Sequence, residues 1–138
     1  MVSGVVVSGL VVWDMGVKYD YKKLDVYKES MTLVMMVYAL LKSFPKEEQY
    51  ALCDQLRRAV VSVPSNLAEG LGRYSAKEQV HFLEIAYGSL REVDCQLDIA
   101  FNLGYITPED LSEIALQYEK VGALLSGLRT KRLCSTNL

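Results

Sequence analysis

Four segments of this 138-residue chain repeat apolar residues at alternating spacings of three and four, and this pattern restricts the fold more than any other feature. Such spacing places apolar side chains on one face of an α-helix that packs along its length. The first segment covers residues 20–43, with the seam Leu24, Tyr27, Met31, Val34, Tyr38 and Leu41. The second covers 46–71, with Leu52, Leu56, Ala59, Val63 and Leu67. The third covers 75–104, with Leu83, Ala86, Leu90, Val93, Leu97 and Ala100. The fourth covers 107–132, with Leu111, Ile114, Tyr118, Val121, Leu125 and Leu128.

The ends of these segments carry recognisable helix signals. Ser75 and Glu78 match a capping box, and Thr107 is an N-cap residue followed by proline and two acids. Gly70 and Gly72 are expected to end the second helix with left-handed backbone. Four helices of about 24–29 residues with short connections predict an all-α, antiparallel, up-down-up-down, left-handed four-helix bundle.

The first helix is apolar on every side over residues 33–41. A helix of this kind is buried on more than one side, and a single bundle core covers only one of them. A second covering surface is therefore implied. We expect a homo-oligomer interface formed by Leu33, Met36, Val37 and Leu40.

The N-terminal segment 1–16 differs from the rest of the chain. Its apolar run over residues 1–13 is shorter than a membrane span, and it lacks the basic residues that begin a secretory signal. Its valines favour extended structure. We expect an apolar extension that is flexible or loosely strand-like, then the bundle domain over 17–133 and a C-terminal tail over 134–138. Met15 would be a natural first residue for the bundle.

Few residues are suited to catalysis. His81 is the only histidine, and Glu78 and His81 supply one Glu-x-x-His pair where metal-binding bundles use two. The three cysteines match no metal or redox spacing, which is typical of reduced thiols in a cytoplasmic protein. We predict no enzyme activity, no cofactor, no metal, no small-molecule substrate and no membrane association. A metal-dependent bundle enzyme is a third interpretation, and it would need a second cluster of His or Glu.

Charge is unevenly distributed along the expected bundle, although the net charge is only −2. The end that collects the start of the first helix, the second turn and the end of the fourth holds eight basic and five acidic residues. The opposite end holds two basic and six acidic residues. A basic end can contact the phosphate backbone of a nucleic acid. The candidate contacts are Arg73, Lys77, Arg129, Lys131 and Arg132, with Arg57 and Arg58 as a further pair.

Several long stretches are similar to one known family. The matching stretches are residues 21–27, 56–70, 72–78, 82–92 and 103–106. They resemble the 23S rRNA-intervening-sequence protein family, also called bacterial four-helix bundle proteins, over about residues 18–130. The resemblance implies a left-handed antiparallel bundle that assembles into a homopentamer and carries no catalytic residues. Some members are encoded within insertions in large ribosomal RNA genes. Related bundle proteins bind a reverse transcriptase and nucleic acid through a basic surface, whereas this chain is net acidic.

The sequence supports two functional hypotheses. In the first, a non-enzymatic bundle self-assembles and acts as an adaptor, and its basic end contacts RNA or a partner of the reverse-transcriptase type. In the second, the bundle is purely a protein–protein interaction scaffold that uses the first helix and the apolar extension, without nucleic-acid binding.

Overall fold

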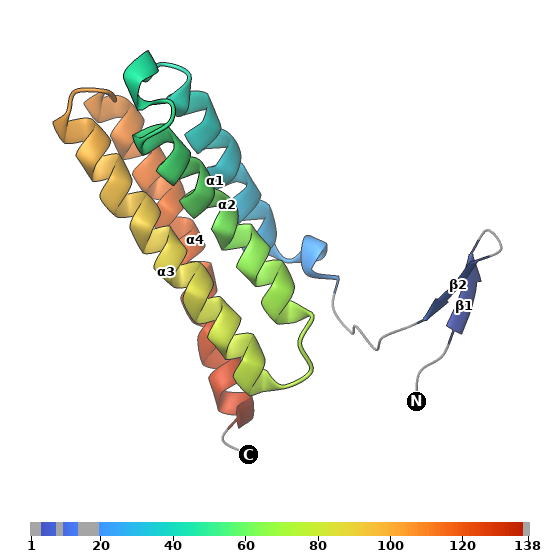
Figure 1. The fold of residues 1–138 in the computed structure, drawn as a ribbon. Coiled ribbons are helices and arrows are strands. Elements are labelled where there is room, and N and C mark those ends of the chain that lie inside the picture. Colours follow the sequence, from blue (N-terminus) through green and yellow to red (C-terminus); the bar gives the residue numbers. More distant parts are fainter. Residues whose placement is uncertain (1–3, 8–9, 14–19, 137–138) are drawn as a thin grey trace.

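Four long helices pack side by side in the computed structural model, which describes residues 4–7, 10–13 and 20–136 (Figure 1). They are α1 (Asp25–Leu41), α2 (Leu52–Leu71), α3 (Ala76–Asn102) and α4 (Pro108–Thr136). Each helix contacts the next one in the chain, and α1 also contacts α4. Successive helices run in opposite directions (Figure 1). The predicted four-helix bundle is confirmed.

Two short strands precede the bundle. β1 (Gly4–Val7) and β2 (Leu10–Trp13) pair in antiparallel register. The sequence favoured extended structure over helix in this part of the chain. The expected start at Met15 and the basic residue Lys18 lie outside the described residues.

The first helix begins later than expected. A 3-10 turn, η1 (Tyr21–Lys23), precedes it, and the Asp20 carboxylate caps this turn by accepting a hydrogen bond from the Lys22 N–H. Leu24 has extended backbone, so α1 begins only at Asp25. The Asp20 cap therefore belongs to the 3-10 turn and not to α1. The predicted continuous helix from residue 20 is wrong.

The second helix is also shorter than expected. Residues Lys46–Glu48 form a 3-10 turn, η2, and α2 begins at Leu52. Arg57, one turn into α2, donates to the Gln49 carbonyl at 3.1 Å and to its side-chain oxygen at 2.9 Å. This tertiary contact holds the chain between η2 and α2 in a turn. At the other end of the chain, α4 continues to Thr136, into the segment expected to be a tail.

The bundle core follows the predicted seams of the second, third and fourth helices. All six predicted seam residues of α3 are buried, as are four of the five in α2. In α4 the buried residues are Ile114, Val121 and Leu125. Each fully buried leucine, isoleucine or valine contributes about 1.5–3 kcal/mol of transfer free energy.

The buried face of α1 differs from the predicted seam and shares only Leu41 with it. The buried face consists of Val26, Ser30, Leu33, Val37 and Leu41. Both faces have helical spacing, and the serine on one of them obscured which face is buried. Ser30 is fully buried because its hydroxyl donates to the Tyr27 carbonyl at 2.8 Å. The satisfied hydroxyl removes the usual penalty for burying a polar group.

The predicted N-terminal caps are confirmed. The Ser75 hydroxyl accepts from the Glu78 N–H at 3.1 Å, and the Thr107 hydroxyl accepts from the Asp110 N–H at 3.1 Å. Each cap satisfies a backbone donor that has no partner inside its helix.

The prediction of left-handed glycines at the end of α2 is wrong. Gly72 has φ −84° in the right-handed region, and among the glycines of the described residues only Gly104, after α3, has positive φ, at 80°. Gly70 is required for a different reason. A Cβ atom at this position would lie 2.6 Å from the Cβ of Phe82, so any other residue here would force α2 and α3 to move apart.

Polar side chains join α2 and α3 near the middle of the bundle. The hydroxyls of Ser62 and Ser89 lie 2.8 Å apart, and the Asn66 amide donates to the Ser62 hydroxyl at 2.8 Å. Ser89 is buried, so this contact belongs to the interior of the helix pair. No helix in the described part of the chain is both long and apolar enough to cross a lipid bilayer.

Candidate interaction surfaces

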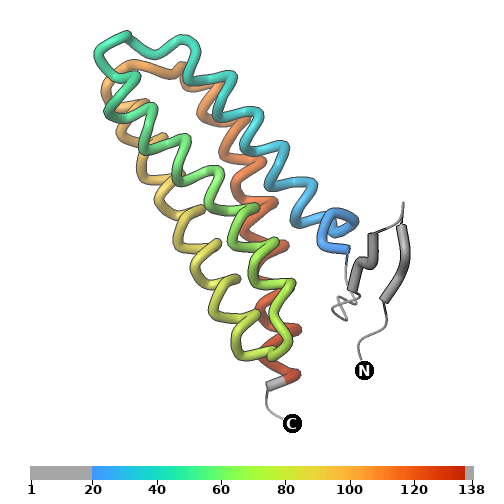
Figure 2. Tube along the Cα trace, turned by 45° about the vertical axis from the view of Figure 1, so that its right-hand side comes forward, coloured from blue at the N-terminus to red at the C-terminus, as the bar shows by residue number. Residues whose placement is uncertain are grey.

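The end of α2, the start of α3 and the end of α4 meet at one end of the bundle, beyond the start of α1 (Figure 2). This end carries five of the predicted nucleic-acid contacts: Arg73, Lys77, Arg129, Lys131 and Arg132. We call these five residues the basic end. The helical order therefore brings together side chains that are far apart in the sequence.

Arg73 and Arg129 of the basic end are paired with carboxylates. Arg73 contacts Glu69 at 2.5 Å, and Arg129 contacts Glu84 at 2.7 Å. Both pairs are exposed, and such pairs contribute at most about 1 kcal/mol. Lys77 is exposed and forms no ion pair with a described residue. Pairing thus reduces the positive charge available to a phosphate backbone.

The corner between α2 and α3 is built tightly. The Arg73 guanidinium lies 4.8 Å from the centre of the Phe82 ring, and the Gln79 side-chain amide donates to the Arg73 carbonyl at 2.8 Å. Close packing at Gly70 places Phe82 there. His81 is exposed beside Phe82. The described residues contain no group of three His, Cys, Asp or Glu side chains that could hold a metal ion.

The structure does not bring the second predicted cation pair to the basic end. Arg57 lies in the first turns of α2, toward the opposite end of the helix, and its guanidinium is bonded to Gln49. Arg58 contacts Asp54 at 3.5 Å, with 82% of its side chain exposed. Arg57 therefore holds the turn before α2 and is not available as a free contact.

The predicted oligomer interface is wrong for two of its four residues. Leu33 and Val37 have no exposed surface, because they face the bundle core. Met36 and Leu40 are partly buried and lie beside α4. An interface between copies of the chain therefore cannot use all four residues.

An exposed apolar surface on α1 and α2 was missed by the interface prediction. Met31, Met35 and Tyr38 of α1 are 38%, 67% and 40% exposed, and Val61 of α2 is 39% exposed. We call these four residues the α1/α2 strip. The three residues of α1 are spaced by four and three, and two of them belong to the seam that was assigned to the core. The signal was therefore present in the sequence but was assigned to the wrong face.

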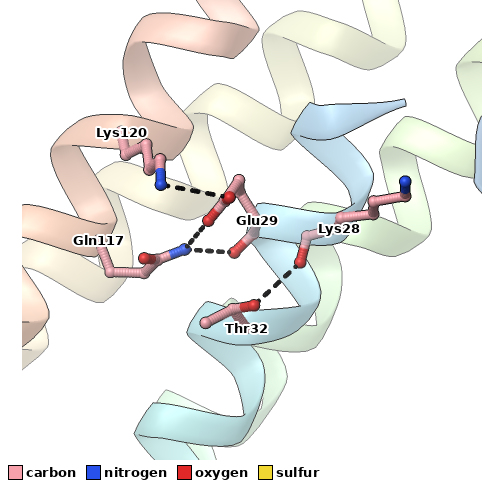
Figure 3. A network of polar contacts seen from close by, with 5 residues as sticks. All are labelled: Lys28, Glu29, Thr32, Gln117 and Lys120. Carbon is pink, nitrogen blue, oxygen red and sulfur yellow. Dashed lines mark hydrogen bonds and ion pairs between the residues drawn. The ribbon is translucent and has the colours of Figure 1, made fainter. Parts of the chain in front are cut away.

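A polar cluster closes part of the seam between α1 and α4 (Figure 3). The Gln117 amide donates to the Glu29 carbonyl at 2.8 Å and to its carboxylate at 2.7 Å. The Lys120 ammonium lies 3.3 Å from the same carboxylate. The hydrogen bond from Gln117, reinforced by Lys120, holds the pKa of Glu29 below its ordinary value. The spacing of apolar residues gives no sign of these contacts.

A groove lies between α1 and α4 toward the end of α1. Its apolar lining includes Met36, Leu40 and Ile114, and its acidic lining consists of Asp110 and Glu113. We call these five residues the α1/α4 groove. Two residues predicted for the oligomer interface thus line a groove of mixed apolar and acidic character.

The three cysteines are free thiols in the structure. Cys53 is buried, and burial raises the pKa of its thiol. Cys95 and Cys134 are exposed on α3 and α4. A buried thiol with a raised pKa is less reactive, because the thiolate is the nucleophile.

The helical order, the capped turns and the close α2–α3 corner define a small four-helix bundle protein. The chain belongs to the 23S rRNA-intervening sequence protein family, whose family model matches residues 22–127. A similar solved structure is that of a protein of unknown function from the S23 ribosomal protein family of Bacteroides thetaiotaomicron. It has a TM-score of 0.70 and 22% sequence identity, and the match covers 76% of this chain and 95% of that one. No curated protein gives a significant match.

Proposed function

We propose that this chain is a non-enzymatic adaptor that self-assembles through the α1/α2 strip, in the ring of five that the family resemblance implies. The observation that carries the proposal is the exposure of four large apolar side chains on adjacent helices. Contiguous exposed apolar surface on a soluble domain marks an interaction site. Methionine also adapts its shape to a partner surface, which suits a contact between copies.

The α1/α2 strip can be tested by the mass of the protein in solution. We expect Met35→Glu to lower the mass from that of an oligomer to that of a monomer, because the change places a charge in a desolvated contact. Leu116→Glu is a matched control, since Leu116 is 70% exposed on α4, outside the strip. Light scattering after size exclusion gives the mass directly. A wild-type chain that is monomeric at every concentration, or equal effects of the two variants, would contradict self-assembly through the strip.

Contact of the basic end with RNA, or with an enzyme that acts on nucleic acid, is the second candidate. The gathering of five cations at one end favours it. We place it second because Arg73 and Arg129 are paired with carboxylates and Arg57 is bonded to Gln49. The purely protein-binding scaffold is the outcome if the basic end binds no RNA.

A filter-binding titration with structured RNA at two salt concentrations tests this second candidate. Binding through phosphates weakens steeply as salt rises. The double variant Lys77→Gln and Lys131→Gln should weaken binding, whereas Lys42→Gln with Lys46→Gln, at the other end of the bundle, should not. Binding that is absent or independent of salt would exclude the contact.

A further inference from the structure

The α1/α4 groove combines an apolar floor with acidic side chains on one wall. Ile114 is fully buried at its base, and Met36 and Leu40 are partly exposed along α1. Asp110 and Glu113 are exposed on α4. The lining on this side runs from Met36 in α1 to Ser43, which lies in the turn just after the helix ends at Leu41, and these seven steps correspond to roughly 10 Å at the helical rise. The groove is thus long enough for two turns of a second helix.

The acidic wall of the groove is not balanced within the chain. Neither Asp110 nor Glu113 forms an ion pair with a described residue. Glu109 and Glu113 are four residues apart on α4, and like charges at this spacing destabilise a helix by about 0.2–0.5 kcal/mol. The first basic residue of α4 is Lys120, which is bonded to Glu29. Lys42 and Lys46 lie at the same end of the bundle but form no ion pair with either carboxylate, so a cation from outside can reach both.

The helix dipole explains the acids of the first turn of α4 but not Glu113. Glu109 and Asp110 lie in that turn, where carboxylates stabilise the positive end of the helix. This effect falls off beyond the first turn, and Glu113 lies beyond it. On the opposite wall, the C-cap of α1 is Lys42, so the negative end of this helix already has a cation beside it.

We propose that the α1/α4 groove binds a short, basic, amphipathic helix of a partner protein. Apolar side chains of that helix would cover Met36, Leu40 and Ile114, and its Lys or Arg residues would reach Asp110 and Glu113. An amphipathic helix in an apolar groove is a recurring form of peptide recognition, and the charges select a basic one. The inference extends the adaptor role proposed above by giving the partner's chemistry, and it does not require self-assembly.

A labelled peptide of about twelve residues, made of Leu and Lys at the spacing of an amphipathic helix, is a suitable probe. We expect its fluorescence anisotropy to rise saturably on titration with the full chain, and we expect added salt to weaken the binding. A peptide with Glu in place of every Lys should not bind. A peptide of the same composition with scrambled order should bind more weakly, because its apolar residues no longer share one face.

Variants of the groove locate the site. Asp110→Asn with Glu113→Gln should weaken binding of the Leu/Lys peptide about five- to tenfold, as expected for the loss of two exposed charge contacts. Glu92→Gln with Glu119→Gln removes two exposed acids outside the groove and should leave the affinity within about twofold. Thermal unfolding of both double variants establishes that the bundle is intact.

Each of the following outcomes would overturn the proposal: no saturable binding of the Leu/Lys peptide, equal binding of the Glu peptide, equal effects of the two double variants, or loss of binding through Met35→Glu alone. A groove variant that changes the mass of the protein in solution while peptide binding stays the same would assign the groove to contact with a second copy of the chain. That result would also refute the proposal of a partner helix. A monomeric chain that binds the peptide through the groove would refute self-assembly but support this proposal.

Discussion

Replacement of Gly70 by alanine sets two opposing effects against each other. Alanine is favoured over glycine inside a helix by up to about 1 kcal/mol. The new Cβ would lie 2.6 Å from the Cβ of Phe82 and 3.3 Å from the Gln79 carbonyl oxygen. Neither atom is the end of a flexible side chain, so the helices must move apart. Overpacking of this kind costs about 1–3 kcal/mol, and we expect a net loss of about 1–2 kcal/mol.

Gly88→Ala provides the matched control. Gly88 lies within α3, and a Cβ there meets nothing within 4 Å. We expect this variant to gain about 0.5–1 kcal/mol from helix propensity. Urea denaturation at one protein concentration measures both changes, and constant concentration matters because self-assembly adds to apparent stability. If Gly70→Ala were as stable as Gly88→Ala, the close packing of α2 on α3 would not limit residue 70.

Three further changes test the core, the α1–α4 contact and the α2–α3 contact. Leu33→Ala should lower the free energy of unfolding by about 2–5 kcal/mol, whereas Leu116→Ala, at an exposed position outside the α1/α2 strip, should change it by less than about 0.5 kcal/mol, and equal losses would contradict the placement of Leu33 in the core. The pKa of Glu29 is lowered in the fold, mainly by Gln117, so its contribution to stability is present above the ordinary carboxyl pKa and is lost as pH falls through the lowered value. Glu29→Gln should therefore reduce the loss of stability at acid pH, and an unchanged acid limb in denaturation curves would refute this. Ser89→Ala should lower the free energy of unfolding by about 1 kcal/mol, measured by urea denaturation. A variant as stable as the wild type would show that this hydrogen bond does not contribute to stability.

The seams of α2, α3 and α4 could be predicted from the sequence because each of these helices has a single continuous apolar face. α1 has two such faces, so spacing alone could not decide which one is buried. Ser30 interrupts the face that is buried, and Met31 and Tyr38 complete the one that is exposed. Ser30 can be buried because its hydroxyl bonds to the backbone of its own helix, and the sequence pattern does not reveal that hydrogen bond.

The late start of α2 could not be predicted from the sequence, because it depends on a side-chain contact. Residues 46–51 have no strong helix breaker after Pro45, but Arg57 draws the Gln49 carbonyl into a tertiary contact. The gathering of cations at the basic end followed from helix order alone. Their pairing with Glu69 and Glu84 depends on side-chain positions, and so does the groove beside Leu40.

The contact between Ser62 and Ser89 also bears on how the bundle selects one arrangement. Apolar seams that repeat every seven residues pack almost equally well after a slip of one heptad. Such a slip would move Ser89 away from Ser62 and would leave the buried Ser89 hydroxyl without this partner, at a cost of about 1–3 kcal/mol. This pair of small polar side chains therefore favours one axial register of α2 against α3, together with the close approach of Gly70 to Phe82, where the leucines beside them discriminate little.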